Sequence, residues 1–282
     1  MAMILQSVNY IYGMGSGQEY HAIKNIDLQI DDGEFVGLVG HSGSGKSTLI
    51  QLMNGLLHAT SGSIYWNGQD IYDKKFSMRN LRGEVGLVFQ YPENQLFAES
   101  VIEDVEFGPK NLGLSNLDVE LRSFEALKQV GIGENLLDVS PLTLSGGQKR
   151  RVAIAGVLAM KPKLLILDEP MAGLDPSGRQ EILKLFSRIH REKKISILLV
   201  SHNMDDVARN AQRILVMNQG EIVLDGEPRK VFQYEEQLRQ IGLGVPQAAS
   251  LIHRIEEHSG EQLDSAITPE ESVASIIKWL EK

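Results

Sequence analysis

A glycine-rich loop followed by a lysine and two hydroxyl residues constrains the fold of this 282-residue chain more than any other feature. Residues 40–48 read Gly-His-Ser-Gly-Ser-Gly-Lys-Ser-Thr, which fits the pattern G-x-x-x-x-G-K-[ST]. In this pattern the glycines let backbone N–H groups approach phosphate oxygens at a helix N-terminus. The apolar run 35–40 predicts a strand before the loop, and residues 47–57 predict a helix after it. The sequence therefore predicts a phosphate-binding loop (P-loop) in an α/β domain.

Short apolar runs alternate with helical stretches beyond the P-loop, which is typical of a parallel sheet covered by helices. The runs are residues 86–90, 164–168 and 195–201. Each ends in polar residues, and the carboxyl ends of parallel strands meet at one rim of a sheet. We therefore expect Gln90, Asp168 and His202 to gather near the P-loop.

Other regions depart from this alternation. Residues 62–68 and 213–226 predict antiparallel pieces, with turns at Asn67-Gly68 and Gln219-Gly220. Residues 91–160 show several helical patterns and little strand character, so we expect a helical insertion there.

The chain is helical and more polar again from about residue 228. Thr268, Pro269 and Glu271 fit the N-cap, N1 and N3 positions of a capping box that starts the last helix. Its apolar residues then share one face: Val273, Ile276, Ile277 and Leu280. Two interpretations stay open, because this face can pack on its own domain or form a dimerisation surface.

Composition excludes several classes of protein. The formal net charge of −9 argues against nucleic acid as the main partner, because phosphate backbones require clustered Lys and Arg. The chain has no cysteine, which excludes disulfides, a thiolate nucleophile and a Cys-based zinc site. The longest apolar run, residues 152–160, is far shorter than the roughly 18 residues that span a bilayer. If the protein acts at a membrane, we expect another chain to cross it.

The polar residues around the P-loop suit phosphoryl chemistry. We expect Lys46 to reach the β- and γ-phosphates and the Ser47 hydroxyl to ligate Mg²⁺. Adjacent carboxylates leave a strand in different directions, so we assign Asp168 to the metal through water and Glu169 to the attacking water as general base. His202 is the expected γ-phosphate sensor. Without the P-loop, a solvated strand end and a structural histidine would be the simpler interpretations.

Residues 144–148, Leu-Ser-Gly-Gly-Gln, predict a second anion-binding helix N-terminus. Together with the P-loop and the Leu-Leu-Ile-Leu-Asp-Glu run at 164–169, this signature motif resembles the nucleotide-binding subunits of ABC transporters. The resemblance extends from about residue 3 to 230. It implies an ABC ATPase fold, a P-loop NTPase core with a mixed sheet, an antiparallel β subdomain and a helical subdomain. The ATPase domain would be residues 1–228, with a C-terminal appendage at 229–282.

The resemblance also implies head-to-tail dimers, in which the signature motif of one subunit closes on the ATP held by the P-loop of the other. Tyr12 is placed under the adenine ring, with Tyr10 as a weaker candidate. Gln90 matches the family's Q-loop, which touches magnesium and relays to a membrane subunit. Residues 172–175, Ala-Gly-Leu-Asp, match the D-loop that bridges the two sites.

The expected site residues fall into three groups. Glu169, His202 and Gln90 are catalytic, and Mg²⁺ is assigned to Ser47, Gln90 and Asp168. The residues expected to contact ATP are Tyr12, Gly40, His41, Ser42, Gly43, Ser44, Gly45, Lys46, Ser47, Thr48, Ser145, Gly146, Gly147, Gln148 and Asp175.

Three longer segments, residues 89–97, 106–111 and 150–160, resemble the ATPases of energy-coupling factor (ECF) transporters, and Tyr-Pro-Glu at 91–93 favours the A-prime type. Such ATPases pair with a similar but distinct ATPase on a transmembrane T component that works with substrate-binding S components. The implied function is to power uptake of vitamins or of cobalt or nickel ions from the cytoplasmic face of a prokaryotic cell membrane, as a peripheral protein. A homodimer stays possible. Met171 departs from the Thr often found there, and we expect little effect.

Residues near Gln90 are expected to receive helices of the T component. Tyr91, Leu96 and Phe97 would then lie on the surface, whereas the simpler alternative buries them in the helical insertion.

Other functions were weighed against ECF transport. The ATPase of a conventional ABC transporter is the nearest alternative. ABC ATPases of DNA repair carry long coiled coils or zinc modules, and those of translation carry two cassettes, whereas this chain has no sustained heptads, no cysteine and one cassette. A small-molecule kinase would leave the signature motif unexplained, and a non-catalytic regulator would not need Glu169 and His202.

Overall fold

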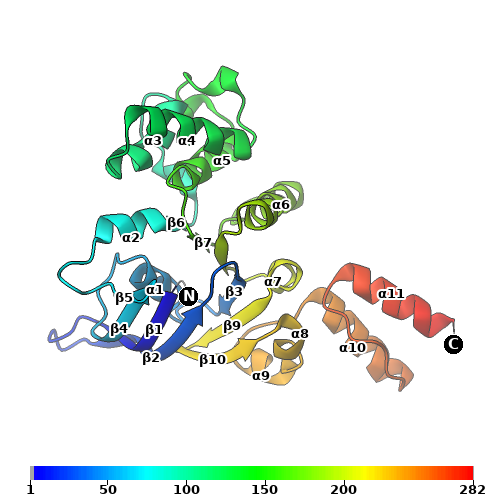
Figure 1. Ribbon diagram of the computed structural model, residues 1–282. Helices are drawn as coiled ribbons and strands as arrows, with labels where there is room; N and C mark the ends of the chain where they lie inside the picture. The colour runs from blue at the N-terminus through cyan, green and yellow to red at the C-terminus, as the bar shows by residue number, and fades with distance from the viewer. Residues whose placement is uncertain (1–2, 282) are drawn as a thin grey trace.

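A six-stranded mixed sheet forms the centre of the protein (Figure 1). The computed structural model describes residues 3–281. The strand order is β10-β9-β3-β8-β7-β6. The strands are β3 (Phe35–Gly40), β6 (Val85–Val88), β7 (Leu164–Asp168), β8 (Ser196–Val200), β9 (Arg213–Asn218) and β10 (Glu221–Gly226). All neighbours pair in parallel except β9 and β10. The predicted parallel strands are confirmed, and the polar residues at their carboxyl ends lie at the same rim of the sheet.

A second, antiparallel sheet has the order β2-β1-β4-β5. Its strands are β1 (Met3–Tyr12), β2 (Tyr20–Ile30), β4 (Ser61–Trp66) and β5 (Gln69–Asp70). The predicted turns are confirmed at Asn67-Gly68, with φ of 49° and 79°, and at Gln219-Gly220, with φ of 48° and 86°. Positive φ at both central residues is the geometry that suits the twist of a tight hairpin.

The helix after the P-loop, α1 (Lys46–Met53), is shorter than the predicted 47–57. Asn54 caps it, and Gly55 follows with a φ of 68°. A glycine in the left-handed region after the cap is a common helix end. The apolar pattern to residue 57 therefore reflects packing of the loop, since Leu57 packs partly buried against the apolar core.

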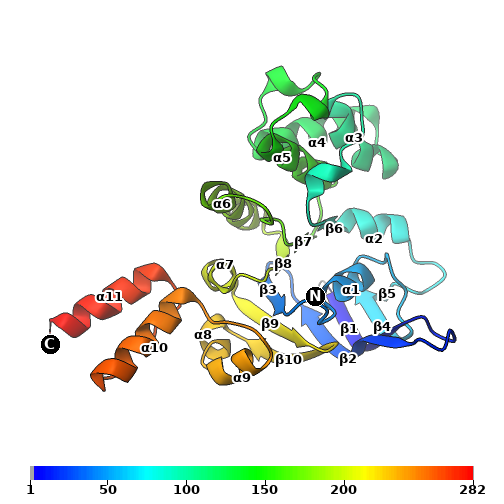
Figure 2. The same ribbon diagram turned by 180° about the vertical axis from the view of Figure 1, so that it is seen from behind.

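The segment between β6 and β7 consists of helices joined by loops, with no strand among the described residues, as predicted for 91–160. It contains η1 (Pro92–Gln95), α3 (Val101–Asn111), α4 (Asn116–Gln129), η2 (Glu134–Leu136), η3 (Pro141–Thr143) and α5 (Gly146–Leu158). A further helix, α2 (Met78–Glu84), precedes β6. Both views show α3, α4 and α5 as a group set away from the sheets (Figures 1 and 2).

Two apolar clusters pack on opposite faces of the central sheet. Along β7, Leu165 and Leu167 belong to one cluster, and Leu164 and Ile166 belong to the other. Successive side chains of a strand point to opposite faces, so a strand that is buried on both sides is apolar at every position. The long helix α6 (Pro176–Lys193) and the short α7 (Met204–Asn210) lie on the first face.

The C-terminal residues form α8 (Pro228–Val231), α9 (Glu235–Gln240), α10 (Gln247–Ser259) and α11 (Pro269–Leu280). The predicted capping box of Thr268 and Glu271 is confirmed at the start of α11. This helix buries Ser272 and Ser275, whereas its large apolar residues are mostly exposed: Val273, Ile277 and Leu280. The interpretation that this apolar face packs on the chain's own domain is therefore wrong for these three residues. Within residues 3–281, no helix has the length and apolar character that crossing a bilayer requires.

Candidate functional site

The P-loop connects β3 to α1 in a conformation that requires glycine. Gly43 and Gly45 have φ of 81° and 106°, in the left-handed region. A Cβ on Gly45 would lie 2.5 Å from the carbonyl oxygen of Ala22, and one on Gly40 would lie 2.5 Å from that of Met217. Lys46 donates from Nζ to the carbonyls of Gly40, at 2.7 Å, and His41, at 2.9 Å. The loop thus curls around its own lysine.

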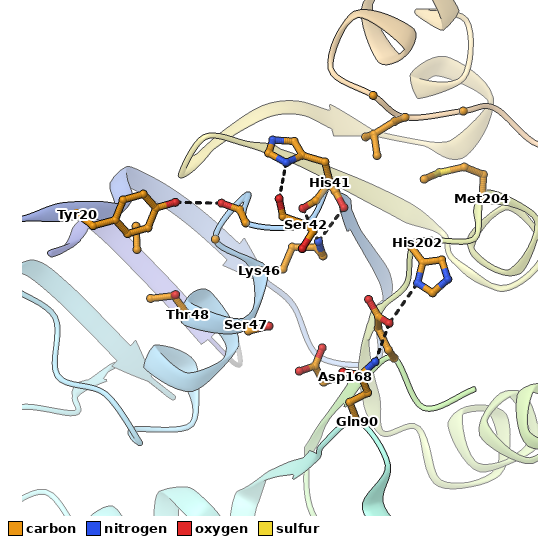
Figure 3. A pocket seen from close by; sticks show the side chains of 18 residues that line it. Tyr20, His41, Ser42, Lys46, Ser47, Thr48, Gln90, Asp168, His202 and Met204 are labelled. Carbon is orange, nitrogen blue, oxygen red and sulfur yellow. Dashed lines mark hydrogen bonds and ion pairs between the residues drawn. The ribbon is translucent and has the colours of Figure 1, made fainter. Parts of the chain in front are cut away.

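Neighbouring strands hold the P-loop in place (Figure 3). The Gly220 N–H donates to the carbonyl of Ser44 at 2.9 Å. His41 Nε2 lies 3.0 Å from Asn218 Oδ1. The Tyr20 hydroxyl donates to the carbonyl of Gly43 at 3.1 Å. The amide groups of the loop are therefore preorganised, which favours binding of an anion at the N-terminus of α1.

A pocket of about 660 Å³ opens over this loop, within the usual size range of small-molecule sites. It combines the P-loop with the ends of β6, β7 and β8, as their parallel arrangement predicts. The lining residues are Tyr20, Ala22, Gly40, His41, Ser42, Gly43, Gly45, Lys46, Ser47, Thr48, Gln90, Asp168, Glu169, His202, Met204 and Gly242, Leu243 and Gly244. Of the predicted P-loop residues, only Ser44 lies behind the wall, fully buried.

Side chains from the ends of three strands meet at Glu169. Gln90 donates from Nε2 to Glu169 Oε2 at 3.3 Å, and His202 Nδ1 lies 3.2 Å from the same oxygen. Glu169 has a φ of 46°, in the left-handed region, directly after the last residue of β7. Such a conformation costs energy for a residue with a side chain and is found most often at functional sites. The turn directs the carboxylate toward Gln90 and His202.

Burial and like charge perturb the acidic pair. Burial, together with the charge of Glu169, raises the pKa of Asp168 to about 6, and Lys46 opposes this shift. Burial lowers the pKa of Lys46, against the opposing charges of Glu169 and Asp168. Two adjacent carboxylates in a partly buried pocket thus lack enough positive charge from protein side chains, so a cation would be stabilised beside them.

The residues assigned to Mg²⁺ fit that ion. Ser47, Gln90 and Asp168 all line the pocket and offer hydroxyl, amide and carboxylate oxygens. No cluster of three or more His, Cys, Asp or Glu residues suited to a metal occurs within residues 3–281. Mg²⁺ is commonly held by one or two carboxylates together with water and substrate phosphates, so this sparse donor set is the expected one.

Tyr12, expected under an adenine ring, is not part of the pocket wall. Its hydroxyl lies 3.2 Å from Thr48 Oγ1, and its ring packs edge-on against Tyr10. The ring is 40% exposed at the side of α1, so Tyr12 borders the pocket through Thr48. Tyr20, which the sequence analysis did not identify, lies directly in the wall.

The signature motif stands apart from this pocket. Ser145 caps α5 and forms a capping box with Gln148, and a Cβ on Gly146 or Gly147 would meet no atom within 4 Å. None of these residues lines the P-loop pocket, and neither does Asp175, which caps α6 by accepting from the Gly178 N–H at 2.8 Å. The chain therefore carries two separate glycine-rich helix N-termini, one at α1 and one at α5.

Sequence reasoning missed three parts of the wall: Tyr20 with Ala22, Met204, and Gly242 to Gly244. A tyrosine that opens a strand just after a glycine-rich stretch is a usable signal for the first. The last segment belongs to the C-terminal helices and carries no motif, so only the folded chain reveals it.

A groove of about 610 Å³ lies between α2, α3, α5 and the segment after Gln90. Phe97 and Phe107, 67% and 49% exposed, pack edge to face in its wall with ring centroids 4.9 Å apart. Leu96 also lines it, and Arg79 and Arg82 add positive charge. Tyr91 and Phe97 are exposed, so the alternative that buries them in the helical insertion is wrong for these two residues. It holds in part for Leu96, which packs partly buried against the core.

Residues 23–172 match the protein-family model described as "ABC transporter". The chain is 54% identical over 280 residues to the energy-coupling factor transporter ATP-binding protein EcfA2 of Caldanaerobacter subterraneus subsp. tengcongensis, covering 99% of this chain and 98% of the relative. It is 49% identical to EcfA2 of Clostridium perfringens, with 99% of both chains covered.

Solved structures give the same family. The structure of cbiO1 from Clostridium perfringens, part of the ABC transporter complex cbiONQ, superimposes with a TM-score of 0.74 and 42% identity over 85% of this chain and 94% of that one. The ATP-binding cassette MJ0796, a dimer in a post-hydrolysis state bound to ADP and Pi, gives a TM-score of 0.69 and 30% identity over 80% of this chain and 98% of that one.

Proposed function

Because this chain belongs to the ATP-binding proteins of energy-coupling factor transporters, within the ABC ATPases, we propose that its P-loop pocket hydrolyses ATP to power solute uptake by an ECF importer. The observation that supports this most is the convergence on Glu169. Gln90 and His202 both contact its carboxylate, and Lys46 and Ser47 line the same pocket.

The pocket residues divide the work of phosphoryl transfer. The amides of residues 43–48 and the ammonium of Lys46 bind and neutralise the phosphates, which keeps the γ-phosphate in line for attack. Glu169 accepts a proton from the attacking water, which Gln90 and His202 help to orient. Lys46 would exchange its two backbone carbonyl partners for phosphate oxygens.

Ser47, Gln90 and Asp168 would hold Mg²⁺, with Asp168 acting through water. When bound, the ion neutralises charge that develops on the phosphate oxygens. The carboxylate of Asp168 must be ionised for this role, although burial and Glu169 raise its pKa to about 6.

A second subunit completes each site. The signature residues Ser145, Gly146, Gly147 and Gln148, together with Asp175, lie outside the pocket of their own chain. They would close over the ATP of a partner in a head-to-tail dimer, and two ATP molecules would join the subunits until hydrolysis. ATP binding then shifts the population toward the closed dimer. The partner is a similar but distinct ATPase, and a homodimer is the second possibility.

The groove beside the Q-loop receives the transmembrane T component, whose S components bind the substrate. Exposed Phe97 and Phe107 offer the aromatic surface that an apolar helix of a partner protein would cover. On the C-terminal side of Gln90, the wall of the groove begins at Gln95, so motion of the Q-loop reaches it through few residues. The chain would then work at the cytoplasmic face of a prokaryotic membrane as a peripheral subunit, without a nucleic-acid partner.

We divide the chain into an ATPase domain at residues 1–228 and a C-terminal dimerisation appendage at 229–282. The exposed apolar residues of α11 support the second role, because Val273, Ile277 and Leu280 are 57%, 51% and 70% exposed in a single chain. The transported solutes would be vitamins or cobalt and nickel ions, and the S component decides which.

Gentle solubilisation of native membranes, pull-down of this chain and mass spectrometry test the proposal. Recovery of a similar ATPase, one T-type membrane protein and small hydrophobic S proteins is the expected result. A conventional permease pair would retain the ABC motor but reject the ECF assignment. A soluble pool, or one bound to nucleic acid, would reject transport.

A further inference from the structure

The segment that leads into α10 forms part of the P-loop pocket. Gly242, Leu243 and Gly244 line it on the side of His202 and Met204. Leu243 and Met204 are 7% and 6% exposed and belong to the same buried apolar cluster. Figure 3 shows His202 and Met204 on one side of the pocket, opposite Tyr20. The segment between α9 and α10 thus reaches the pocket with the buried side chain of Leu243 and with the backbone of Gly242 and Gly244.

Gly242 and Gly244 present only backbone atoms to the pocket, because neither has a side chain. A Cβ on Gly242 or on Gly244 would meet no atom within 4 Å. Gly242 needs its glycine for another reason, a φ of 77°, whereas no such constraint applies to Gly244. Glycines often occur where a backbone approaches a ligand closely. The backbone of Gly244 is therefore accessible to whatever occupies the pocket.

A hydrogen bond joins this segment to the residues that carry His202. Pro246 is the N-cap of α10 and offers no side-chain hydrogen bond. The Gln247 N–H instead donates to Asp205 Oδ1 at 2.9 Å. Free N–H groups at a helix start require an acceptor, and here a carboxylate from a distant helix supplies it. Asp205 lies in the first turn of α7, three residues after His202.

The hydrogen bond between Gln247 and Asp205 matters because Asp205 belongs to the helix that directly follows His202. Asn203 caps α7 by accepting from the N–H groups of Asp205 and Asp206. Asp206, 6% exposed, is bonded to Arg179 of α6 at 2.6 Å. The side chain of His202 is 65% exposed, and its ring lies beside the carboxylate of Glu169. The position of its ring therefore depends on α7, which lies between α6 and the start of α10.

We propose that Gly242, Leu243 and Gly244 are part of the nucleotide site and that Asp205 is the positioning residue that joins them to His202. The placement of the C-terminal helices then sets the distance between His202 and Glu169, and through it the rate of ATP hydrolysis. This inference rests on the proposed function, because it assigns the pocket to a nucleoside triphosphate.

Steady-state ATP hydrolysis by the full-length chain, assembled with its partner subunits, tests the role of Asp205. Asp205→Ala removes the acceptor of the Gln247 N–H. We expect kcat to fall roughly threefold to tenfold, the equivalent of one lost hydrogen bond, with KM for ATP little changed. Asp205→Asn keeps an oxygen acceptor and should restore kcat. Glu257→Ala, which removes an exposed pair with His253 inside α10 and no contact with α7, is the matched control and should leave kcat unchanged.

Gly244→Leu tests the wall independently of Asp205. The new side chain meets no neighbour within 4 Å of its Cβ, so the fold should be retained, while KM for ATP should rise at least about threefold. If Asp205→Ala does not fold, Gly244→Leu still tests whether this segment belongs to the nucleotide site.

Some results would overturn the inference. A folded Asp205→Ala with wild-type kcat, or a loss that Asp205→Asn does not restore, would reject the positioning role. An unchanged KM for ATP in Gly244→Leu would reject the claim that this segment is part of the nucleotide site. Wild-type protein that fails to hydrolyse ATP would instead reject the proposed function, and Lys46→Ala provides the baseline for that distinction.

Discussion

The two glycine-rich helix N-termini of this chain, at α1 and α5, differ in how they are supported. At α1, the P-loop is held by Gly220, by Asn218 through His41 and by Tyr20, and a pocket surrounds it. At α5, Ser145 and Gln148 satisfy each other in a capping box, and the two glycines face open space. The first terminus is therefore organised by contacts within its own chain, as the proposed nucleotide site requires.

The second terminus stands apart from the P-loop pocket of its own chain. Its glycines have no neighbour within 4 Å that they must accommodate, so their absence of side chains has no packing reason inside this chain. Glycine at the start of a helix costs stability relative to alanine. Such a cost is consistent with a surface that must let another subunit's ATP approach closely. The comparison teaches that one half-site is organised by folding and the other by assembly.

The largest expected effect comes from removing the base at the first half-site. Glu169→Gln should keep ATP binding and the closed dimer while turnover falls at least about a hundredfold, because the attacking water loses its proton acceptor. Phosphate release measures turnover, and light scattering with ATP measures dimerisation. Glu181→Gln, a carboxylate on the exposed face of α6, is the control. Turnover within a few-fold of wild type would refute the assigned base.

The second half-site should fail in the opposite way. Gly147→Asp places a negative charge where a partner's phosphates would approach, and we expect turnover to fall about tenfold to a hundredfold. Folding should be unaffected, because the Cβ meets no atom and a carboxylate at a helix start is favourable. Nucleotide binding to the isolated chain, followed by fluorescence of a labelled ATP analogue, should stay at the wild-type level. Loss of that binding would contradict the separation of the half-sites.

The free energy of unfolding should also distinguish a glycine of the P-loop from a glycine of the signature motif. Gly45→Ala forces a Cβ to 2.5 Å from the Ala22 carbonyl at a φ of 106°, so the free energy of unfolding should fall by about 1–3 kcal/mol. Gly146→Ala, in the first turn of α5, has no such conflict and should be neutral or stabilising by up to about 1 kcal/mol. Urea denaturation measures both. Equal stabilities would show that folding constrains the two loops equally.

The smallest effect concerns the ion pairs that hold the helical insertion to the rest of the chain. Glu125 of α4 pairs with Lys161 at 2.9 Å and Lys193 at 2.7 Å, and these bonds lower its pKa from 4.5 to about 2. A lowered folded-state pKa contributes stability above pH 4.5 that is lost as the pH falls toward 2. Because the pair is exposed, Glu125→Gln should cost less than about 1 kcal/mol at pH 7.

Urea titrations of Glu125→Gln and wild type at a series of pH values test this point. The difference in unfolding free energy should shrink as the pH falls below 4.5, because wild-type Glu125 is then protonated on unfolding. A difference that is constant with pH would mean that Glu125 acts through packing and not through its charge.

Local sequence predicted much of the fold. The strand 164–168 was predicted with its observed bounds, and both tight turns and the capping box at Thr268 have the expected geometry. These features depend on a few adjacent residues, whose steric and hydrogen-bonding requirements the sequence states directly. The helix after the P-loop was predicted four residues too long, because Asn54 and Gly55 end it although the apolar pattern continues.

The candidate site was predictable wherever it follows from strand order. Once the strands are parallel, Gln90, Asp168 and His202 must share a rim, and the structure places all three in one pocket. Tyr12 was placed by resemblance alone, and it lies beside Thr48 instead of in the pocket wall. Gly244 was not identified, because no periodicity or motif distinguishes it. Tyr20 was missed although it opens a strand just after a glycine-rich stretch.

The sequence by itself determined the chemistry: which residues can bind phosphate, which carboxylate follows which strand, and that two helix starts can accept an anion. Those properties reside in residue type and spacing along a few consecutive residues. Only the tertiary structure decided that Glu169 bonds both Gln90 and His202, and that Asp205 caps a helix 42 residues further along the chain. Contacts of this kind depend on how distant segments pack, and packing is set by the whole buried core and by no single stretch of sequence.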